Sequence, residues 1–414
     1  MSRFRDVLKD KNFFFFWLGQ IISQFGDRLT QMALIAFVFK HWGGSAFGLA
    51  KVMSFTIIPS FLIGPIAGAY VDRWNRKYTM IITDIIRAAL VLSIPLFLIR
   101  LHSLVPIYIC IFLVFTASCF FLPSKLSIIP ELVSKEKLLV ANSLTNTTIM
   151  MAAVLGVGLG GPLIEVVGAK IGFYIDATTY IFSAVLLSFI TVNNVHLKES
   201  SRQAPNISGI VNKSIFSDII VGIKYVFTHP YLRFIFFTIF IIMCAAGALY
   251  IIAIVFIQQV FGSVTRDLGF LSIFLGAGLF LGALGCGRFG HKISKVKVIF
   301  LSLIACGIFI GSFAIFLKIY PSLRIAAVLA VFIGMSVGPI FISGNTLIHE
   351  VIKSDMRGRI FSSLGIAMNL GFLLFMFVAS KLSEFFNPMG VILIISACFV
   401  VYGLIGLISF KTRY

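Results

Sequence analysis

The stretch GAYVDRWNRKY, residues 68–78, places four charged side chains within six positions between two long apolar segments. The apolar run FTIIPSFLIGPIAG leads into it, and the apolar run TMIITDIIRAALVLSIPLFLI follows it directly. Apolar runs of about 18 residues or more are long enough to cross the hydrocarbon core of a bilayer as a helix. The stretch therefore predicts a short polar loop between two membrane-spanning helices.

The composition of the whole chain agrees with this interpretation. Of its 414 residues, 59% are hydrophobic and 12% are charged, whereas a soluble domain carries about 25% charged residues. Runs such as IYICIFLVFTASCFFL do not alternate between apolar and polar residues, which argues against a β-barrel. We therefore predict an all-α polytopic membrane protein.

The distribution of basic residues indicates the orientation of the chain in the membrane. The formal net charge is +19, and Lys and Arg concentrate in the loops on the side of the N-terminus. This is the pattern of the positive-inside rule. The first apolar run, from Asn12, is too long for a signal peptide and is interpreted as a retained span. The sequence thus predicts a multi-pass membrane protein with both termini cytoplasmic and no nucleic-acid partner.

Hydropathy predicts twelve spans separated by one extended polar stretch. We expect a six-helix bundle over residues 1–193, a cytoplasmic linker over 194–230 with a short amphipathic helix in SDIIVGIKYVFTHP, and a second six-helix bundle over 231–414. The predicted spans are 13–39, 47–71, 78–99, 104–123, 141–164, 171–193, 232–260, 268–289, 298–317, 322–345, 360–382 and 388–410.

A constant offset of 219 residues relates the two halves. It aligns the loop that begins at Gly68 with the one that begins at Gly287, and it aligns Glu131 with Glu350. Two separate loops that agree on one offset indicate a duplication. Parallel repeats of six spans are one architecture of secondary transporters.

The loop also carries a motif. GAYVDRWNRK resembles the signature G-x-x-x-D-R-x-G-R-K of the major facilitator superfamily, with Asn75 in place of the usual glycine. Asn also tolerates positive φ. Within the superfamily the chain most resembles bacterial macrolide-efflux-type drug exporters and their siderophore-exporter relatives, on stretches such as FFFFWLGQIIS (13–23) and RGRIFSSLGIAMNLG (357–371). The resemblance implies two pseudo-symmetric halves that rock about a central site, and a location in the inner (plasma) membrane of a bacterium.

The first span contains the most informative polar residues. Gln20, Gln24, Asp27 and Gln31 are spaced to share one helical face. A carboxylate at the depth of Asp27 is costly and usually faces a cavity or a partner. We expect Asp27 to be the protonatable coupling group, with Arg28 and the glutamines at the substrate cavity. The alternative is that Asp27 pairs with Arg28 or with another helix and only packs the bundle.

Two further spans contain acids. Asp84 and Arg87, three residues apart, are expected to form an ion pair on one helix face near the charged loop, or alternatively a proton relay. Asp176 lies near the expected outer end of the sixth span and is interpreted as an interfacial or capping acid.

The fifth span contains LGVGLGGP, which resembles a degenerate form of the antiporter signature of drug exporters. Its small residues also allow close helix packing, so packing alone would explain them. The motif residues are Gly156, Gly158, Gly160, Gly161 and Pro162.

The resemblance implies that the charged loop is a cytoplasmic gate. In the superfamily the acid of this loop docks on the N-terminal end of the eleventh span, where the helix dipole favours an anion. Here that would join Asp72 to the segment with Arg357 and Arg359. His291 is the counterpart of Asp72 and lacks its charge. The other predicted gate residues are Gly68, Arg73, Arg76, Lys77, Asp84 and Arg87.

These features predict a secondary transporter that exports an amphipathic organic compound of the macrolide type by proton antiport. A lysophospholipid or siderophore translocator of the same fold is the alternative, and a membrane-embedded enzyme or receptor is disfavoured. The expected partners are the substrate, protons and membrane lipids, and the chain is expected to be a monomer. No GxxxxGK[ST] loop is present, the six cysteines are isolated, and no metal or cofactor is expected.

Overall fold

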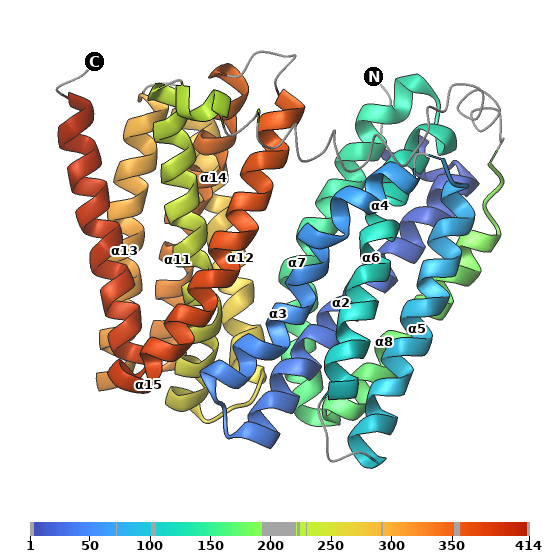
Figure 1. Ribbon diagram of the computed structural model, residues 1–414, viewed down its shortest axis with the longest axis horizontal. Helices are drawn as coiled ribbons and strands as arrows, with labels where there is room; N and C mark the ends of the chain where they lie inside the picture. The colour runs from blue at the N-terminus through green and yellow to red at the C-terminus, as the bar shows by residue number, and fades with distance from the viewer. Residues whose placement is uncertain are drawn as a thin grey trace. The chain divides into compact units, whose positions relative to one another are not determined.

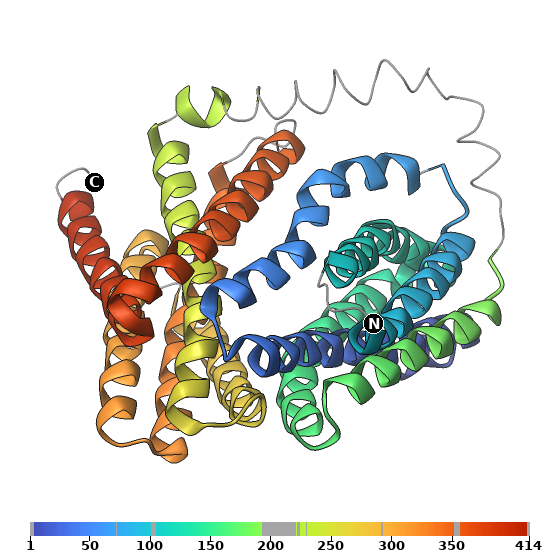
Figure 2. The same ribbon diagram turned by 60° about the horizontal axis from the view of Figure 1, so that its bottom comes forward.

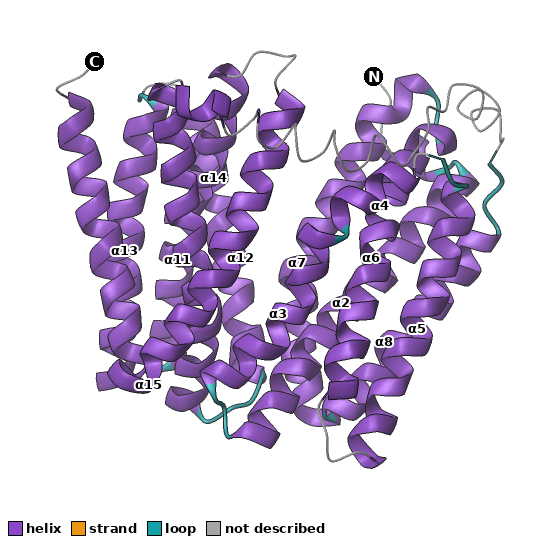
Figure 3. Cartoon of the chain, viewed as in Figure 1, coloured by secondary structure: helices purple, strands orange, loops and turns teal. Residues whose placement is uncertain are grey.

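The computed structural model describes residues 4–71, 73–100, 105–192, 221, 224–228, 230–290, 293–351 and 357–411. Within these ranges the chain is helical and contains no strand (Figure 3). It divides into two compact units. The first comprises Met1–Phe37 and Val52–Ile215, and the second comprises Val38–Lys51 and Phe216–Tyr414.

The first unit is built mainly from long apolar helices (Figure 1). Within it, α5 packs against both α6 and α8 (Figure 2). The tips of α2 and α3 fall in the second unit. The helices are α1 (Phe4–Leu8), α2 (Lys11–Trp42), α3 (Ala46–Leu62), α4 (Gly64–Val71), α5 (Arg76–Arg100), α6 (Val105–Leu132), the 3-10 helix η1 (Lys135–Lys137), α7 (Leu138–Val167) and α8 (Ala169–Ser188).

The predicted second span, 47–71, is interrupted. It forms α3 and α4, which are separated at Ile63. Pro59 lies inside α3, and Pro65 follows directly after the first residue of α4. A proline has no backbone N–H to donate to the preceding turn, which gives a physical reason for a break here. The fourth span differs in the other direction, because α6 continues nine residues beyond the predicted end at 123, past Pro123 and Pro130.

The second unit contains α11 (Pro230–Phe261), α12 (Arg266–Phe289), α13 (Lys295–Ile319), α14 (Leu323–Val351) and α15 (Arg357–Lys411). The two last predicted spans both lie in α15, which kinks at Asn387 with φ 55° and ψ 163°. The residue before a proline avoids the α region, and Pro388 follows. The Asn387 side chain accepts a hydrogen bond from the Gly390 amide at 3.0 Å, as an N-cap does.

Glycines set the helix spacing in the second unit. A Cβ atom added at Gly278 would lie 2.1 Å from the Val331 carbonyl oxygen, and one added at Gly334 would lie 2.2 Å from the Leu275 carbonyl oxygen. Helices α12 and α14 therefore approach each other backbone to backbone, as small-residue interfaces allow in membranes.

Helix starts repeat the offset found in the sequence. Helices α2 and α11 begin at Lys11 and Pro230, and α5 and α13 begin at Arg76 and Lys295. Each pair is separated by 219 residues. Of the predicted linker, only Val221 and residues 224–228 fall in the described ranges, and these are helical.

Nine described helices are long and apolar enough to cross a membrane. Large apolar side chains on their outer faces are exposed, for example Leu139, Val166 and Phe385. Such a surface fits lipid better than water. The kinked α15 contains two of the twelve predicted spans, and the first span (α2) and the split second span (α3 and α4) are not among the nine. The nine helices therefore fit the twelve predicted spans.

Candidate functional site: a buried acid–base cluster

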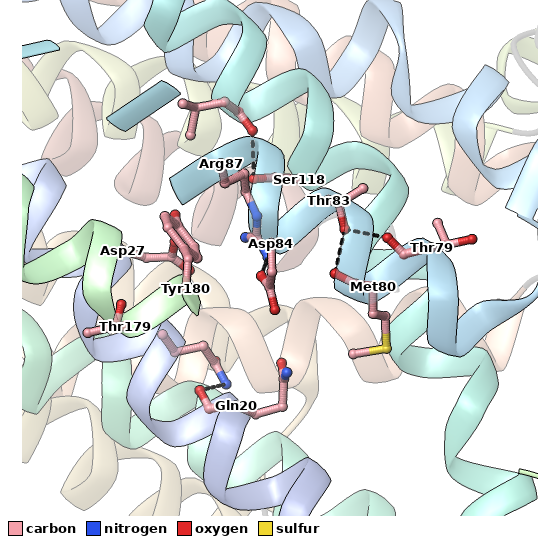
Figure 4. A network of polar contacts seen from close by, with 12 residues as sticks. Gln20, Asp27, Thr79, Met80, Thr83, Asp84, Arg87, Ser118, Thr179 and Tyr180 are labelled. Carbon is pink, nitrogen blue, oxygen red and sulfur yellow. Dashed lines mark hydrogen bonds and ion pairs between the residues drawn. The ribbon is translucent and has the colours of Figure 1, made fainter. Parts of the chain in front are cut away.

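Ionisable side chains from α2, α5, α6 and α8 gather inside the first unit. Arg87 turns toward Asp84, with Tyr180 beside them and Gln20 near the pair on a neighbouring helix (Figure 4). Asp84, Arg87, Lys125 and Asp176 each have at most 3% of their surface exposed. Buried charges at this depth need partners, so the contacts of each group matter.

Asp84 and Arg87 form the expected ion pair within α5. The Arg87 guanidinium also lies 4.1 Å from the ring centre of Phe121 and 4.4 Å from that of Tyr180. Aromatic faces attract cations more strongly where water is excluded. The pair is therefore held between α6 and α8, in the interior of the bundle, and its neighbours include Asp27 and Asp176, which interact electrostatically with Arg87.

Asp27 accepts a hydrogen bond from the Tyr180 hydroxyl of α8. The alternative hypothesis named Arg28 or another helix as the partner of Asp27, and the contact with α8 is of the second kind. Arg28 instead donates to Gln31 Oε1 at 3.0 Å and packs against Gly156 of α7. Asp27 is only partly buried. It is therefore the carboxylate of the cluster with some access to the surroundings.

Asp176 is not the interfacial acid that the sequence suggested. It is fully buried, about two turns into α8, and its Oδ2 accepts a 2.5 Å hydrogen bond from the Thr30 hydroxyl of α2. The predicted span began at 171, whereas α8 begins at Ala169 and is preceded by Gly168 with φ 81°. Asp176 therefore joins α8 to α2 inside the bundle.

Lys125 was missed because the fourth span was predicted to end at residue 123. It lies in α6 with 3% of its surface exposed, and Asp27 is the charge that acts on it most strongly. The apolar residues that follow Lys125, in LSIIPEL, were the signal in the sequence for a longer helix.

The glutamines predicted to share one polar face of α2 make different contacts in the structure. Gln20 is buried, and neither polar atom of its side-chain amide has a hydrogen-bond partner among the described residues. Gln24 donates to the Gln20 carbonyl oxygen at 3.1 Å, whereas Gln31 accepts from Arg28. Unpaired buried amides cost free energy. Gln20 is thus a polar group suited to bind water or a ligand near the acid–base pair.

The glycine motif of α7 serves close packing. A Cβ atom at Gly156 would lie 2.7 Å from Arg28 Cγ, and one at Gly160 would lie 3.2 Å from Leu29 Cδ2. Gly158 and Gly161 are also buried, and Pro162 lies inside the helix. The structure therefore shows that the motif positions α2 against α7, and its link to antiport remains a proposal.

The charged loop is held by contacts within the first unit. Arg76 forms an ion pair with Glu131 and donates to the Ser127 carbonyl oxygen at 2.9 Å. Lys77 donates to the carbonyl oxygens of Ser188 and Ile190.

Arg73 is exposed. A Cβ atom added at Gly68 would meet no atom of another described part of the chain within 4 Å. Asp72, His291 and the side chains of Arg357 and Arg359 lie outside the described residues. The predicted latch between Asp72 and the start of the eleventh span falls on them. The described contacts of Asp84 and Arg87 lie in the buried cluster, and their expected coupling to this loop stays a prediction.

The second unit contains an apolar pocket of about 220 Å³ between α11, α14 and α15. Its lining is aliphatic, aromatic and thioether side chains with one amide, from Asn345. Gly344 and Gly365 lie in its wall, where an added Cβ atom would meet at most a distant contact of 3.9 Å. A pocket of this kind suits an apolar ligand.

Ionisable residues inside membrane-spanning helices mark substrate and ion pathways, and repeated sets of spans are an architecture of secondary transporters. The family model for the Major Facilitator Superfamily matches residues 16–319 and 241–413. The chain belongs to this superfamily, and it is a multi-pass membrane protein with the fold of a transporter.

Known proteins agree with this assignment. The chain is 27% identical to the uncharacterized MFS-type transporter YkuC of Bacillus subtilis, over 94% of this chain and 91% of that protein. It is 25% identical to macrolide efflux protein A of Streptococcus pyogenes, over 86% of each. A bacterial homologue of the iron transporter ferroportin, in an inward-facing state, has the same fold with a TM-score of 0.76 at 13% identity, over 98% of this chain and 99% of that one.

Proposed function

We propose that this transporter exports an amphipathic organic compound of the macrolide type in exchange for protons. The observation that carries the proposal is the buried cluster, in which Asp27 is partly accessible and lies next to the Asp84–Arg87 pair, Tyr180 and Lys125. Intramembrane acids of this kind mark proton relays and substrate pathways. The similarity to macrolide efflux protein A supports the substrate class.

The chemistry of exchange follows from the charges. Burial favours the neutral form of a carboxyl group, whereas a nearby cation favours the ionised form. A cationic group of the substrate that approaches Asp27 would thus expel a proton from the site, and a returning proton would weaken substrate binding. Proton and substrate then exclude each other, which is what antiport requires.

The test uses inside-out membrane vesicles with a pH gradient and erythromycin as the probe. Asp27→Asn removes the titratable group and keeps the shape, so gradient-driven accumulation should fall at least tenfold. Glu384→Gln is the matched control, because Glu384 is exposed and pairs only with Lys381 among the described residues. Accumulation by the wild-type protein that a protonophore leaves unchanged would refute proton antiport.

A further inference from the structure

The buried cluster of the first unit has one acid more than it has bases. Its acids are Asp27, Asp84 and Asp176, and its bases are Arg87 and Lys125. Asp84 is paired directly with Arg87, and the strongest charge acting on Lys125 is that of Asp27. This assignment leaves Asp176 as the carboxyl group without a cation of its own.

The contacts of Asp176 are hydroxyl groups. Thr30 donates to its Oδ2 at 2.5 Å, and the Thr179 hydroxyl oxygen lies 2.7 Å from the main-chain oxygen of Asp176 and 3.2 Å from its Oδ1. Both hydroxyl groups donate to the carboxyl group, and a hydroxyl donor supplies no positive charge. Among the described residues, no cation lies within hydrogen-bond distance of Asp176.

The charges around Asp176 favour its neutral, protonated form. Asp27 on α2 repels an ionised Asp176, and Arg87 on α5 attracts it but is already paired with Asp84. On α8 itself, Tyr180 donates to Asp27. Lys125 on α6 acts on Asp27, Arg87 and Asp84, and Glu165 of α7 is exposed. An uncompensated charge in this interior would be costly.

We propose that Asp176 is the second carboxyl group of the proton site, which holds one proton that it shares with Asp27 between α2 and α8. Buried carboxyl groups that lie close together commonly share one proton in this way. The proton resides on Asp176 while Asp27 is ionised beside Lys125 and Tyr180, and it leaves through Asp27, the partly accessible member. This inference rests on the proposed proton antiport and names the residue that binds the proton.

Infrared spectroscopy of the purified full-length protein in detergent tests the assignment without any substrate. When the spectrum at neutral pH is subtracted from the spectrum at alkaline pH, the wild-type protein should show the loss of the C=O band of one protonated carboxyl group. Asp176→Asn should abolish this change, and Glu384→Gln should retain it. The inference is overturned if the band change persists in Asp176→Asn or if the wild-type protein shows none.

Two threonine variants keep the inference testable should Asp176→Asn fail to fold. Thr30→Val removes a donor that favours the ionised carboxylate, so the pH at which the band is lost should rise by about one unit. Thr179→Val removes the second donor, at 3.2 Å from Oδ1, so that pH should also rise, by a smaller amount. A fall of this pH in either variant, or no shift in both, would overturn the protonated Asp176 site.

Transport measurements distinguish a coupling role of Asp176 from a structural role. With erythromycin in vesicles, Asp176→Asn should lose accumulation driven by a pH gradient but keep exchange between preloaded and external compound. An amide that only replaces a structural hydrogen bond would preserve both, which would overturn the shared proton site. Wild-type accumulation that ignores the gradient would instead refute the proposed antiport, while the infrared result would still report whether Asp176 holds a proton.

Discussion

Arg76, the first residue of α5, forms an ion pair with Glu131 near the end of α6. Lys295, the first residue of α13, forms the corresponding pair with Glu350 near the end of α14. Both pairs join residues 55 positions apart, and the 219-residue offset relates one pair to the other. The duplication therefore preserved a specific interaction as well as the helical architecture.

The two pairs should differ in strength. Side-chain exposures are 26% and 15% for Arg76 and Glu131, against 36% and 53% for Lys295 and Glu350. Partly buried charged hydrogen bonds contribute more than exposed ones. We expect Glu131→Gln to destabilise the protein by about 1 kcal/mol, and Glu350→Gln by less than about 0.5 kcal/mol. Thermal unfolding in detergent measures both, and equal losses would contradict the ranking.

Gly26 occupies a tightly packed position that no sequence motif indicated. A Cβ atom at this position would lie 2.0 Å from Thr179 Oγ1 and 2.3 Å from Asp176 Oδ1. We expect Gly26→Ala to separate α2 from α8, to displace Asp176 and to lower gradient-driven transport at least tenfold. Gly64→Ala is the control, since a Cβ atom there meets no neighbour within 4 Å. Normal transport by Gly26→Ala would show that the α2–α8 contact is not needed in this form.

The sequence was sufficient for the fold because long apolar runs and one offset define the helices and their repetition. It was less successful inside the bundle, where side-chain roles depend on helix boundaries. Ending the fourth span at residue 123 excluded Lys125, which α6 includes because it continues through Pro123 to Leu132. Because Asp176 was expected near a membrane surface, its contact with Thr30 inside the bundle was not predicted. The Asp84–Arg87 pair was predictable because both residues lie on one helix.

The interface between α12 and α14 provides a prediction for the second unit alone. Gly278→Leu should disrupt it, because even a Cβ atom would lie 2.1 Å from the Val331 carbonyl oxygen. We expect a loss of several kcal/mol, in the range of overpacked or separated interfaces, with reduced yield of folded protein. Gly285→Leu on the same helix faces open space and should fold normally. Size-exclusion chromatography and thermal unfolding compare the two, and similar behaviour would refute the packing role.

The apolar pocket of the second unit predicts a graded effect on ligand affinity. Gly365 lies in its wall, and a Cβ atom there has no neighbour within 4 Å, so larger side chains can enter the pocket without straining the backbone. If the apolar part of the exported compound binds here, Gly365→Ala should weaken erythromycin binding slightly and Gly365→Leu by about tenfold, equivalent to about 1.4 kcal/mol. Thermal stability should stay within about 0.5 kcal/mol of wild type. Binding is measured on the purified protein, and an unchanged affinity for Gly365→Leu would place the apolar contact of the substrate elsewhere.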